Sequence, residues 1–370
     1  MEKKSLFIKS DGALIPKYKI NANILDVADL LRDPIQDGES ICINSEACLE
    51  VVHAQLEKGA TKEAIELLKN KFAFREATAR LFPELKYYKT SLKDLESVQV
   101  KSVIKPVKGF FSAGVRIIEP NDDLKIIKSA LLADIKRLSE YFSETVLSSE
   151  EWLVEDCIEG QELAVDMYYN TEGEPIILNI TLHPMPSDPH YLNAIYWTSE
   201  ELFNFWKGPV EQFFKFLNTD ILNVVNFPIH AEFRINQEKL IPIEMNPMRF
   251  GGFGLADLAY YGLGFNPYDM FFNNTSPDWE AIWEQRMGQR FCWALGYNGK
   301  EIDPEQSVPD HTAFITFCGQ EHLLHYRPID WKSLPVFALA YLSLDTQEEI
   351  DAFLTVDFNQ FFHASVPAYL

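Results

Sequence analysis

The chain has 370 residues, a formal net charge of −22 at pH 7, 47% hydrophobic residues and 13% aromatic residues. A chain of this length and composition can bury a sizeable core, and we expect two or three packed units rather than one small domain. The strong negative charge repels phosphate backbones and anionic lipid, which argues against nucleic acid or a membrane as the main partner. Scattered lysines fit a small-molecule site better.

Residues 1–19 carry charges but no apolar core of signal-peptide length, and no uninterrupted apolar stretch of about 20 residues occurs elsewhere. We therefore expect a cytoplasmic protein. The cysteines form no CxxC pair and are odd in number, so neither a zinc knuckle nor a disulfide framework is predicted. They are Cys42, Cys48, Cys157, Cys292 and Cys318.

The first half of the chain alternates strand and helix patterns. Residues 41–44 read as a strand, and residues 61–82 keep a helical period of apolar side chains. Residues 102–106 and 115–118 read as strands around a glycine-containing loop. Apolar residues at steps of three and four from Leu124 to Phe142 then predict an amphipathic helix.

Further strands are predicted at residues 152–156, 162–169 and 175–182, followed by a hairpin over residues 230–247. Beyond about residue 275 the pattern changes. There we predict one helix over residues 279–295, strands at 312–318 and 336–344, and a helix at 346–354. We interpret residues 275–370 as a C-terminal α+β extension.

The hairpin sequence HAEFRINQEKLIPIEMNP brings two carboxylates together. If the turn is centred on Glu238, Glu232 faces Glu244 across the strands, and His230 faces Asn246. Like charges about 5 Å apart in such a pair are destabilising, so a positive group must lie between them. Mg²⁺ or Mn²⁺ fits two carboxylates plus an amide oxygen. The alternative is that an arginine or lysine neutralises the pair on a solvated sheet face.

The sequence KPVKGFFSAGV is typical of a phosphate-binding loop between two strands. Gly109 and Gly114 let backbone N–H groups approach an anion, the Ser112 hydroxyl adds a donor, and Lys105 supplies a fixed positive charge. The pattern is neither a P-loop nor a GxGxxG turn. A hairpin with a mobile glycine tip is the alternative interpretation.

The sequence WLVEDCIEGQELAVD contains a link between two predicted strands. Backbone groups from Glu155 to Ile158 could read the edge of an adenine, and the Glu162 carboxylate could accept hydrogen bonds from ribose hydroxyls. An exposed acidic strand edge is the alternative, because the protein is strongly acidic.

These three stretches, in this order, resemble the ATP-grasp family over residues 86–254. The resemblance implies an α+β fold in which the nucleotide lies between two α+β subdomains. It divides the chain into a short N-terminal α/β segment (1–85), an ATP-grasp domain (86–274, with subdomains 86–157 and 158–274) and the C-terminal extension (275–370).

The resemblance also assigns residues. It implies that Lys105 and the loop from Gly109 through Ser112 to Gly114 contact the ATP phosphates. Glu155 and Ile158 would hold adenine, and Glu162 the ribose. The implied metal ligands for Mg²⁺ (or Mn²⁺) are Glu232, Glu244 and Asn246. Arg249 would contact the reacting phosphate, although Met248 separates it from the usual position after Asn-Pro. Lys86, or alternatively Lys89, would be a second nucleotide-facing lysine.

The function implied is ATP-dependent ligation, in which a substrate carboxylate becomes an acyl phosphate that an amine or thiol attacks. The partners are then small molecules, with no nucleic acid and no membrane, and a homodimer is left open. A carboxylase, a kinase-like phosphotransferase and a non-catalytic nucleotide-binding module are the alternatives. His183 and His190 are candidates for the wall of the acceptor site.

Overall fold

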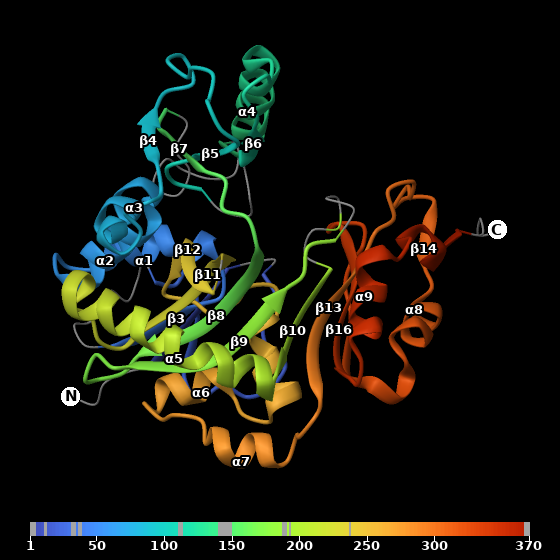
Figure 1. Cartoon of the computed structure of the whole chain (residues 1–370). Coiled ribbons are helices and arrows are strands. Elements are labelled where there is room, and N and C mark those ends of the chain that lie inside the picture. The colour runs from blue at the N-terminus through green and yellow to red at the C-terminus, as the bar shows by residue number, and fades with distance from the viewer. Residues whose placement is uncertain are drawn as a thin grey trace.

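The computed structural model describes residues 5–10, 13–30, 35, 39–109, 114–139, 150–186, 191, 194–236 and 238–365, with only the backbone described at 135 and 137–139. A long, curved central sheet dominates the molecule (Figure 1). The N-terminal elements lie at one end of this sheet, a smaller sheet with one long helix projects above it, and the C-terminal helices cover its other end.

The N-terminal part is a small parallel sheet in the order β2-β1-β3, formed by β1 (Ser5–Lys9), β2 (Asn23–Asp26) and β3 (Ser40–Ile43). Phe7, Ile8 and Cys42 are fully buried, as is usual for parallel strands that are covered on both faces. Three helices follow: α1 (Leu49–Gln55), α2 (Ala60–Lys69) and α3 (Lys71–Thr78). The helical pattern predicted over residues 61–82 is therefore interrupted at Asn70.

The smaller sheet has the order β4-β7-β5-β6 and is antiparallel. Its strands are β4 (Tyr87–Thr90), β5 (Ser102–Pro106), β6 (Arg116–Ile118) and β7 (Trp152–Asp156), and α4 (Leu124–Ser139) packs on it. A separate core containing Ile104, Leu131 and Trp152 holds the helix to the strands. The strands predicted for this region are confirmed, and so is the helix as far as Ser139, since Phe142 lies outside the described residues.

The central sheet has eight strands in the order β12-β11-β8-β9-β10-β13-β16-β15, and its neighbours pair antiparallel. The strands are β8 (Gln161–Tyr169), β9 (Pro175–His183), β10 (Ile195–Ser199), β11 (Phe227–Asn236), β12 (Lys239–Pro247), β13 (Arg290–Tyr297), β15 (Leu323–Pro328) and β16 (Val336–Leu344). Helix α5 (Glu200–Leu217) packs against β9 and begins where the Ser199 hydroxyl accepts a hydrogen bond from the Leu202 N–H. Two shorter helices, α6 (Pro267–Phe272) and α7 (Trp279–Glu284), precede β13.

Strands of the C-terminal extension continue the central sheet rather than forming a sheet apart from it, because β13 pairs with β10. Beyond the sheet lie α8 (His311–Cys318), α9 (Gln347–Thr355) and a small ribbon of β14 (Ser307–Pro309) and β17 (Phe362–Ala364). The Thr346–Glu349 capping box begins α9, which confirms the helix predicted there.

Two predictions for this part are wrong. The helix predicted over residues 279–295 ends at Glu284, and the chain turns through Gly288 at φ +77 before β13. The strand predicted at 312–318 is helix α8. Asp310 caps its first turn, and the buried Phe314 and Cys318 lie four residues apart on one face.

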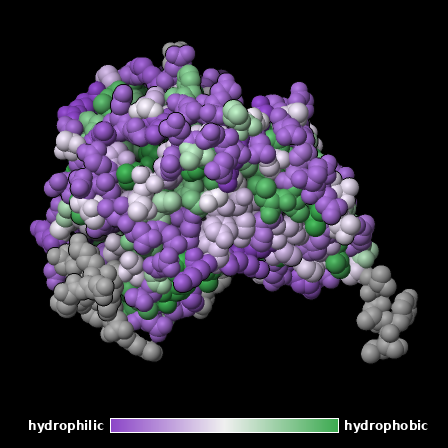
Figure 2. Space-filling view, turned by 90° about the horizontal axis from the view of Figure 1, so that it is seen from below, coloured by the Kyte–Doolittle hydropathy of each residue, from purple (hydrophilic) through white to green (hydrophobic). Residues whose placement is uncertain are grey.

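On the face turned downward in Figure 1, hydrophilic residues predominate and hydrophobic residues form small patches (Figure 2). Within the described part of the chain, no helix is long and apolar enough to cross a membrane. All five cysteines are free, and Cys157 is the one that is not buried.

Candidate active site

A cavity of about 1110 Å³ lies between the smaller sheet and one face of the central sheet. Side chains from β5, β6 and the residues after β7 line one side. Strands β12, β11, β8, β9, β10, β13 and β16 line the other. The three stretches singled out in the sequence therefore meet at one cavity, although they are far apart along the chain.

The β11–β12 hairpin pairs Glu232 with Glu244 and His230 with Asn246, which confirms these two predicted pairs. A β-bulge follows, because Phe233 pairs with Pro242 and leaves Ile243 as the extra residue. The Ile243 carbonyl accepts a hydrogen bond from Lys105 Nζ at 3.3 Å. The bulge thus joins the hairpin to the lysine of the facing sheet.

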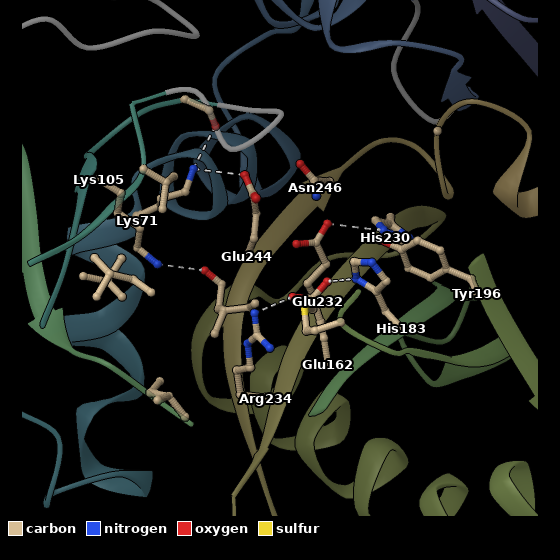
Figure 3. A pocket seen from close by; sticks show the side chains of 18 of the residues that line it. Lys71, Lys105, Glu162, His183, Tyr196, His230, Glu232, Arg234, Glu244 and Asn246 are labelled. Atoms are coloured by element: carbon tan, nitrogen blue, oxygen red, sulfur yellow. Dashed lines mark hydrogen bonds and ion pairs between the residues drawn. The ribbon is translucent and has the colours of Figure 1, made fainter. Parts of the chain in front are cut away.

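The two facing carboxylates have opposite pKa shifts. Burial and the nearby charge of Glu244 raise the pKa of Glu232, although His230 Nε2 lies 3.6 Å from its Oε1. Burial acts in the same sense on Glu244, but Lys71 at 3.0 Å and Lys69 outweigh it and lower the pKa of that carboxyl. Figure 3 shows Lys71 beside Glu244 and His230 beside Glu232. The cation beside Glu244 therefore favours the charged form of that carboxyl over that of Glu232.

Asn246 is the third residue, with Glu232 and Glu244, that the sequence analysis assigned to a metal ion. It is 2% exposed, and its Oδ1 has no hydrogen-bond partner among the residues that the structure describes. A buried oxygen without a donor beside two carboxylates is a costly arrangement that a hard cation relieves. Among the described residues no group of three or more His, Cys, Asp or Glu side chains is placed to hold a metal ion.

Lys105, on β5 of the smaller sheet, is buried, with 6% of its surface exposed. Its Nζ is 2.6 Å from Glu155 Oε1, while the other oxygen of Glu155 accepts from Arg75 Nε at 2.8 Å. Burial lowers the pKa of Lys105 in spite of Glu155, and the two cations lower the pKa of Glu155 in spite of burial. The Glu155 side chain therefore serves to position the lysine.

Lys71 is a site residue that the sequence analysis missed. It is the first residue of α3, whose N-cap Asn70 accepts a hydrogen bond from the Ala73 N–H at 2.9 Å. Its Nζ donates to Glu244 Oε1 at 3.0 Å and to the Gly109 carbonyl at 2.8 Å. The helix break at Asn70 is what points this lysine into the cavity, and asparagine is a favoured N-cap residue that could have indicated the break.

The predicted second lysine is not in the cavity lining. Lys86 is exposed, and its main chain pairs with Asp156. Lys89 is also exposed and forms an ion pair with Glu151 at 2.6 Å. Both lysines lie at or beside β4, the edge strand of the smaller sheet, which is separated from the cavity-lining β5 by β7.

The glycine loop is described at its two ends. Gly109 lines the cavity, and Gly114, at φ +70, precedes the cavity-lining Val115. Ser112 lies outside the described residues, and so does His190.

The link after β7 forms another wall of the cavity, through Asp156, Cys157, Ile158, Glu159 and Gly160. Gly160 has φ +129, and a Cβ there would lie 1.9 Å from the Ile235 carbonyl oxygen, so only glycine fits. Glu162 follows on β8. Its Oε1 accepts from His183 Nδ1 at 2.8 Å and its Oε2 lies 3.1 Å from Arg234 Nη2.

Arg249 lines the cavity beside the hairpin and is 8% exposed. Its Nε donates to Glu46 Oε1 at 2.9 Å, and Lys69 Nζ lies 2.9 Å from the other oxygen of Glu46. Burial opposes ionisation of Glu46, but the two cations prevail and lower its pKa to about 2. Met248, at φ +65, turns the chain just before Arg249.

Comparison with known families agrees with this geometry. Residues 98–257 match the model of the ATP-grasp domain. Residues 98–257 of the chain therefore form an ATP-grasp domain. The matched region includes Lys105, the link after β7 and the whole β11–β12 hairpin. A search of curated protein sequences finds no match.

Solved structures with the ATP-grasp fold cover nearly the whole chain. The L-amino acid ligase from Bacillus licheniformis is 15% identical, with a TM-score of 0.63 and coverage of 98% of each chain. The N5-carboxyaminoimidazole synthase from Aspergillus clavatus, in complex with ADP and 5-aminoimidazole ribonucleotide, is 12% identical, with a TM-score of 0.56 and coverage of 95% of this chain and 96% of that one. The biotin carboxylase domain dimer of 2-oxoglutarate carboxylase from Hydrogenobacter thermophilus, in complex with MgADP, is 13% identical, with a TM-score of 0.54 and coverage of 92% and 77%.

Proposed function

We propose that this ATP-grasp protein is an ATP-dependent ligase that activates a substrate carboxylate as an acyl phosphate for attack by an amine or a thiol. The observation that carries the proposal is the convergence of Glu232, Glu244 and the unsatisfied Asn246 oxygen with three cations, Lys71, Lys105 and Arg249, around one cavity. Such a set of charges suits a polyphosphate together with a divalent cation.

ATP would lie across the cavity between the two sheets. Adenine would contact the link at Cys157 and Ile158, where the chain has left strand β7, and ribose would lie near Glu162. The phosphates would then extend toward Lys105 and Lys71. The glycine loop is joined to this end by the hydrogen bond from Lys71 Nζ to the Gly109 carbonyl, so nucleotide binding and loop position would be linked.

The residues fit a bound Mg²⁺ or Mn²⁺. Glu232, Glu244 and Asn246 would be its protein ligands, because the amide oxygen lacks a hydrogen-bond partner and the carboxylates face each other. A cation bound there would supply positive charge against the nucleotide phosphates. Lys71 now makes the ion pair that partly neutralises Glu244, and it would exchange that carboxylate for a phosphate oxygen when ATP binds.

The chemistry would follow in two steps. A carboxylate oxygen of the substrate forms a bond to the γ-phosphorus while the bond from phosphorus to the bridging oxygen breaks and ADP leaves. The amine or thiol then attacks the acyl carbon, and phosphate leaves with the oxygen that first attacked phosphorus. Lys105 and Arg249 would stabilise the negative charge that develops on the transferring group. Glu155 and Glu46 hold these two cations in place.

Hydroxylamine trapping tests the proposal. With ATP, Mg²⁺ and a panel of carboxylic acids, but no natural nucleophile, an acyl phosphate is converted to a hydroxamate because it is a reactive anhydride. We expect hydroxamate to form with at least one acid and with release of ADP. A stable phosphorylated alcohol or amine in its place would favour a kinase-like phosphotransferase, and nucleotide binding without any turnover across the panel would favour a non-catalytic module.

A further inference from the structure

The lining of the cavity changes in character across the central sheet. Strands β12, β11 and β8 contribute Glu244, Glu232 and Glu162, whereas β10, β13 and β16 contribute uncharged side chains. We call the second set, together with the adjoining loop residues, the apolar end. It consists of Tyr196, Phe253, Leu255, Trp293, Leu295, Tyr297, Pro335 and Val336. In Figure 3, Tyr196 lies on the side of Glu232 away from Lys71 and Lys105.

The apolar end begins directly beside Arg249. A Cβ built on Gly252 would lie 3.6 Å from Arg249 Nη1, with no other atom of the described residues within 4 Å apart from its immediate neighbours. The next residue, Phe253, accepts a hydrogen bond through its carbonyl from Trp293 Nε1 at 3.2 Å. A carboxylate placed at Arg249 therefore has apolar surface within the length of one side chain.

The walls of the apolar end are held by their own contacts. Tyr196 stacks on His183 with ring centroids 4.0 Å apart and meets the edge of Trp293 at 5.5 Å. The Tyr341 hydroxyl donates to the Gly254 carbonyl at 2.7 Å, which ties the loop of Phe253 to β16. Trp293 and Leu295 are 3% and 5% exposed. This surface is formed before any substrate enters, so it can select by shape and polarity.

We propose that the carboxylate substrate is an acid whose carbon chain ends in an uncharged apolar group, aromatic or branched aliphatic, that packs against the apolar end. This inference rests on the proposed ligase function and names its substrate class. A charged group placed there would lose its hydration and meet Tyr196, Trp293 and Leu295, none of which carries a charge that could neutralise it. The acid, rather than the nucleophile, is assigned to this surface because the surface continues from Arg249, where the carboxylate must react.

The selectivity is measured with hydroxylamine as the nucleophile, so that differences among acids report on the acid site alone. The acids are 4-methylpentanoate and 3-phenylpropanoate, compared with glutarate and 5-aminopentanoate, which have similar length but end in a charge. We expect kcat/KM for hydroxamate formation to be at least roughly tenfold higher for the apolar acids. Equal or higher values for either charged acid would overturn the inference and leave the ligase function intact.

Binding is measured as well, because it requires no turnover. Calorimetry with ADP and Mg²⁺ present should show the two apolar acids binding at millimolar concentration or below, and the charged acids binding at least roughly tenfold more weakly. Apolar acids that bind without hydroxamate formation would contradict the proposed function but support the substrate class. Absence of binding by both apolar acids would overturn the substrate class.

Variants inside and outside the apolar end test whether this surface determines the preference among acids. Leu295→Ala removes apolar contact at the site, while Leu324→Ala removes the same atoms from an exposed leucine on β15 outside the lining. We expect Leu295→Ala, and not Leu324→Ala, to raise KM for 4-methylpentanoate by roughly tenfold, with KM for ATP unchanged.

A second pair of variants carries little risk to folding. Met185→Lys changes an exposed residue of the cavity, and Met287→Lys is its control outside the lining. Met185→Lys should reduce the ratio of kcat/KM for 4-methylpentanoate to kcat/KM for glutarate. An unchanged preference in both Leu295→Ala and Met185→Lys would overturn the inference.

Discussion

The charged and apolar ends of the cavity are built in different ways. At the charged end, buried carboxylates lie beside cations: Glu155 contacts Lys105 and Glu244 contacts Lys71, and just behind this end Glu46 contacts Arg249. At the apolar end, rings and aliphatic side chains pack on each other, and their hydrogen bonds run to the backbone carbonyls of Phe253 and Gly254. The first end would determine the chemistry, and the second would determine which acid undergoes it.

Two buried carboxylates illustrate the same difference. Glu46 lies behind the charged end, between Lys69 and Arg249, and its pKa falls to about 2. Asp257 lies behind the loop of the apolar end, where burial raises its pKa to about 7 although the Tyr18 hydroxyl donates to it at 2.8 Å. Burial acts on both in the same direction, so the outcome depends on whether cations lie beside the carboxylate.

The largest effect is expected from Glu244→Gln, which removes a charge from the charged end with little change in volume. Hydroxamate formation should fall by roughly 10³ or more, because the variant loses a ligand of the proposed cation. Binding of Mn²⁺, followed by electron paramagnetic resonance, should weaken in parallel. Glu84→Gln, which changes an exposed carboxylate paired with Lys239, is the control. Full turnover of Glu244→Gln in saturating Mg²⁺ would contradict the assignment.

A smaller loss is expected from Arg249→Ala. If the guanidinium acts mainly in the transition state, kcat should fall by roughly 10² while KM for ATP changes little. Since the substitution also leaves Glu46 with one cation fewer, thermal unfolding of the variant must be measured alongside. A rise in KM for ATP at constant kcat would show that Arg249 binds nucleotide without assisting the transfer.

Lys71 lines the cavity and Lys86 lies outside it, so substitutions of these two lysines test which one contacts the nucleotide. Lys71→Ala should weaken ATP binding by roughly tenfold or more, because the ammonium is proposed to contact phosphate, and should leave adenosine binding nearly unchanged. Lys86→Ala, at an exposed residue outside the cavity, should change neither. Equilibrium dialysis with both ligands distinguishes the cases. Equal weakening of ATP and adenosine would place Lys71 away from the phosphates.

The smallest effect concerns stability and not activity. Asp257 has a raised pKa in the folded protein, so folding takes up a proton between about pH 4 and 7, and its contribution to stability is lost as the pH rises through that window. Glu46 has a lowered pKa, so its contribution is present above its ordinary value of 4.5 and is lost as the pH falls toward 2. Asp257→Asn should therefore flatten the pH dependence of the free energy of unfolding in urea between pH 5 and 7, by roughly 1.4 kcal/mol per pH unit at most.

Glu46→Gln is the counterpart for the acid side. Its effect on the urea midpoint should be constant from pH 5 to 7 and should shrink below pH 4.5, as the wild-type carboxyl begins to lose its advantage. The same pH slope for both variants would show that the two carboxylates do not differ as described.

The charged end was largely predictable because its residues lie in short local patterns. Alternation along two strands and a turn centred on Glu238 predicted the pair of Glu232 and Glu244. In the structure the pairs nearer the turn are offset by one residue from that register, and the bulge restores the predicted pair. The bulge at Ile243 was not predictable, since the alternation continues through it. Lys71 was missed because the helical period runs through Asn70, where the side chain caps a new helix instead.

The apolar end was not predictable from local patterns. It combines β10, β13 and β16 with the loop around Phe253, and nothing in any one stretch indicates that they meet. Two of its neighbours were also misassigned. The helical pattern predicted over residues 279–295 concealed β13, and the β-branched and aromatic composition of residues 312–318 concealed helix α8, whose cap at Asp310 lies outside that stretch.

The bond that would form at the γ-phosphorus gives the most direct test of the proposed ligase function. An apolar acid labelled with ¹⁸O in its carboxylate is incubated with ATP, Mg²⁺ and hydroxylamine, and the released phosphate is analysed by mass spectrometry. If the carboxylate attacks phosphorus, one labelled oxygen leaves with each phosphate, and Glu244→Gln reduces the rate at which labelled phosphate appears. Label that stays wholly in the organic product while ADP accumulates would contradict acyl phosphate formation and with it the ligase function.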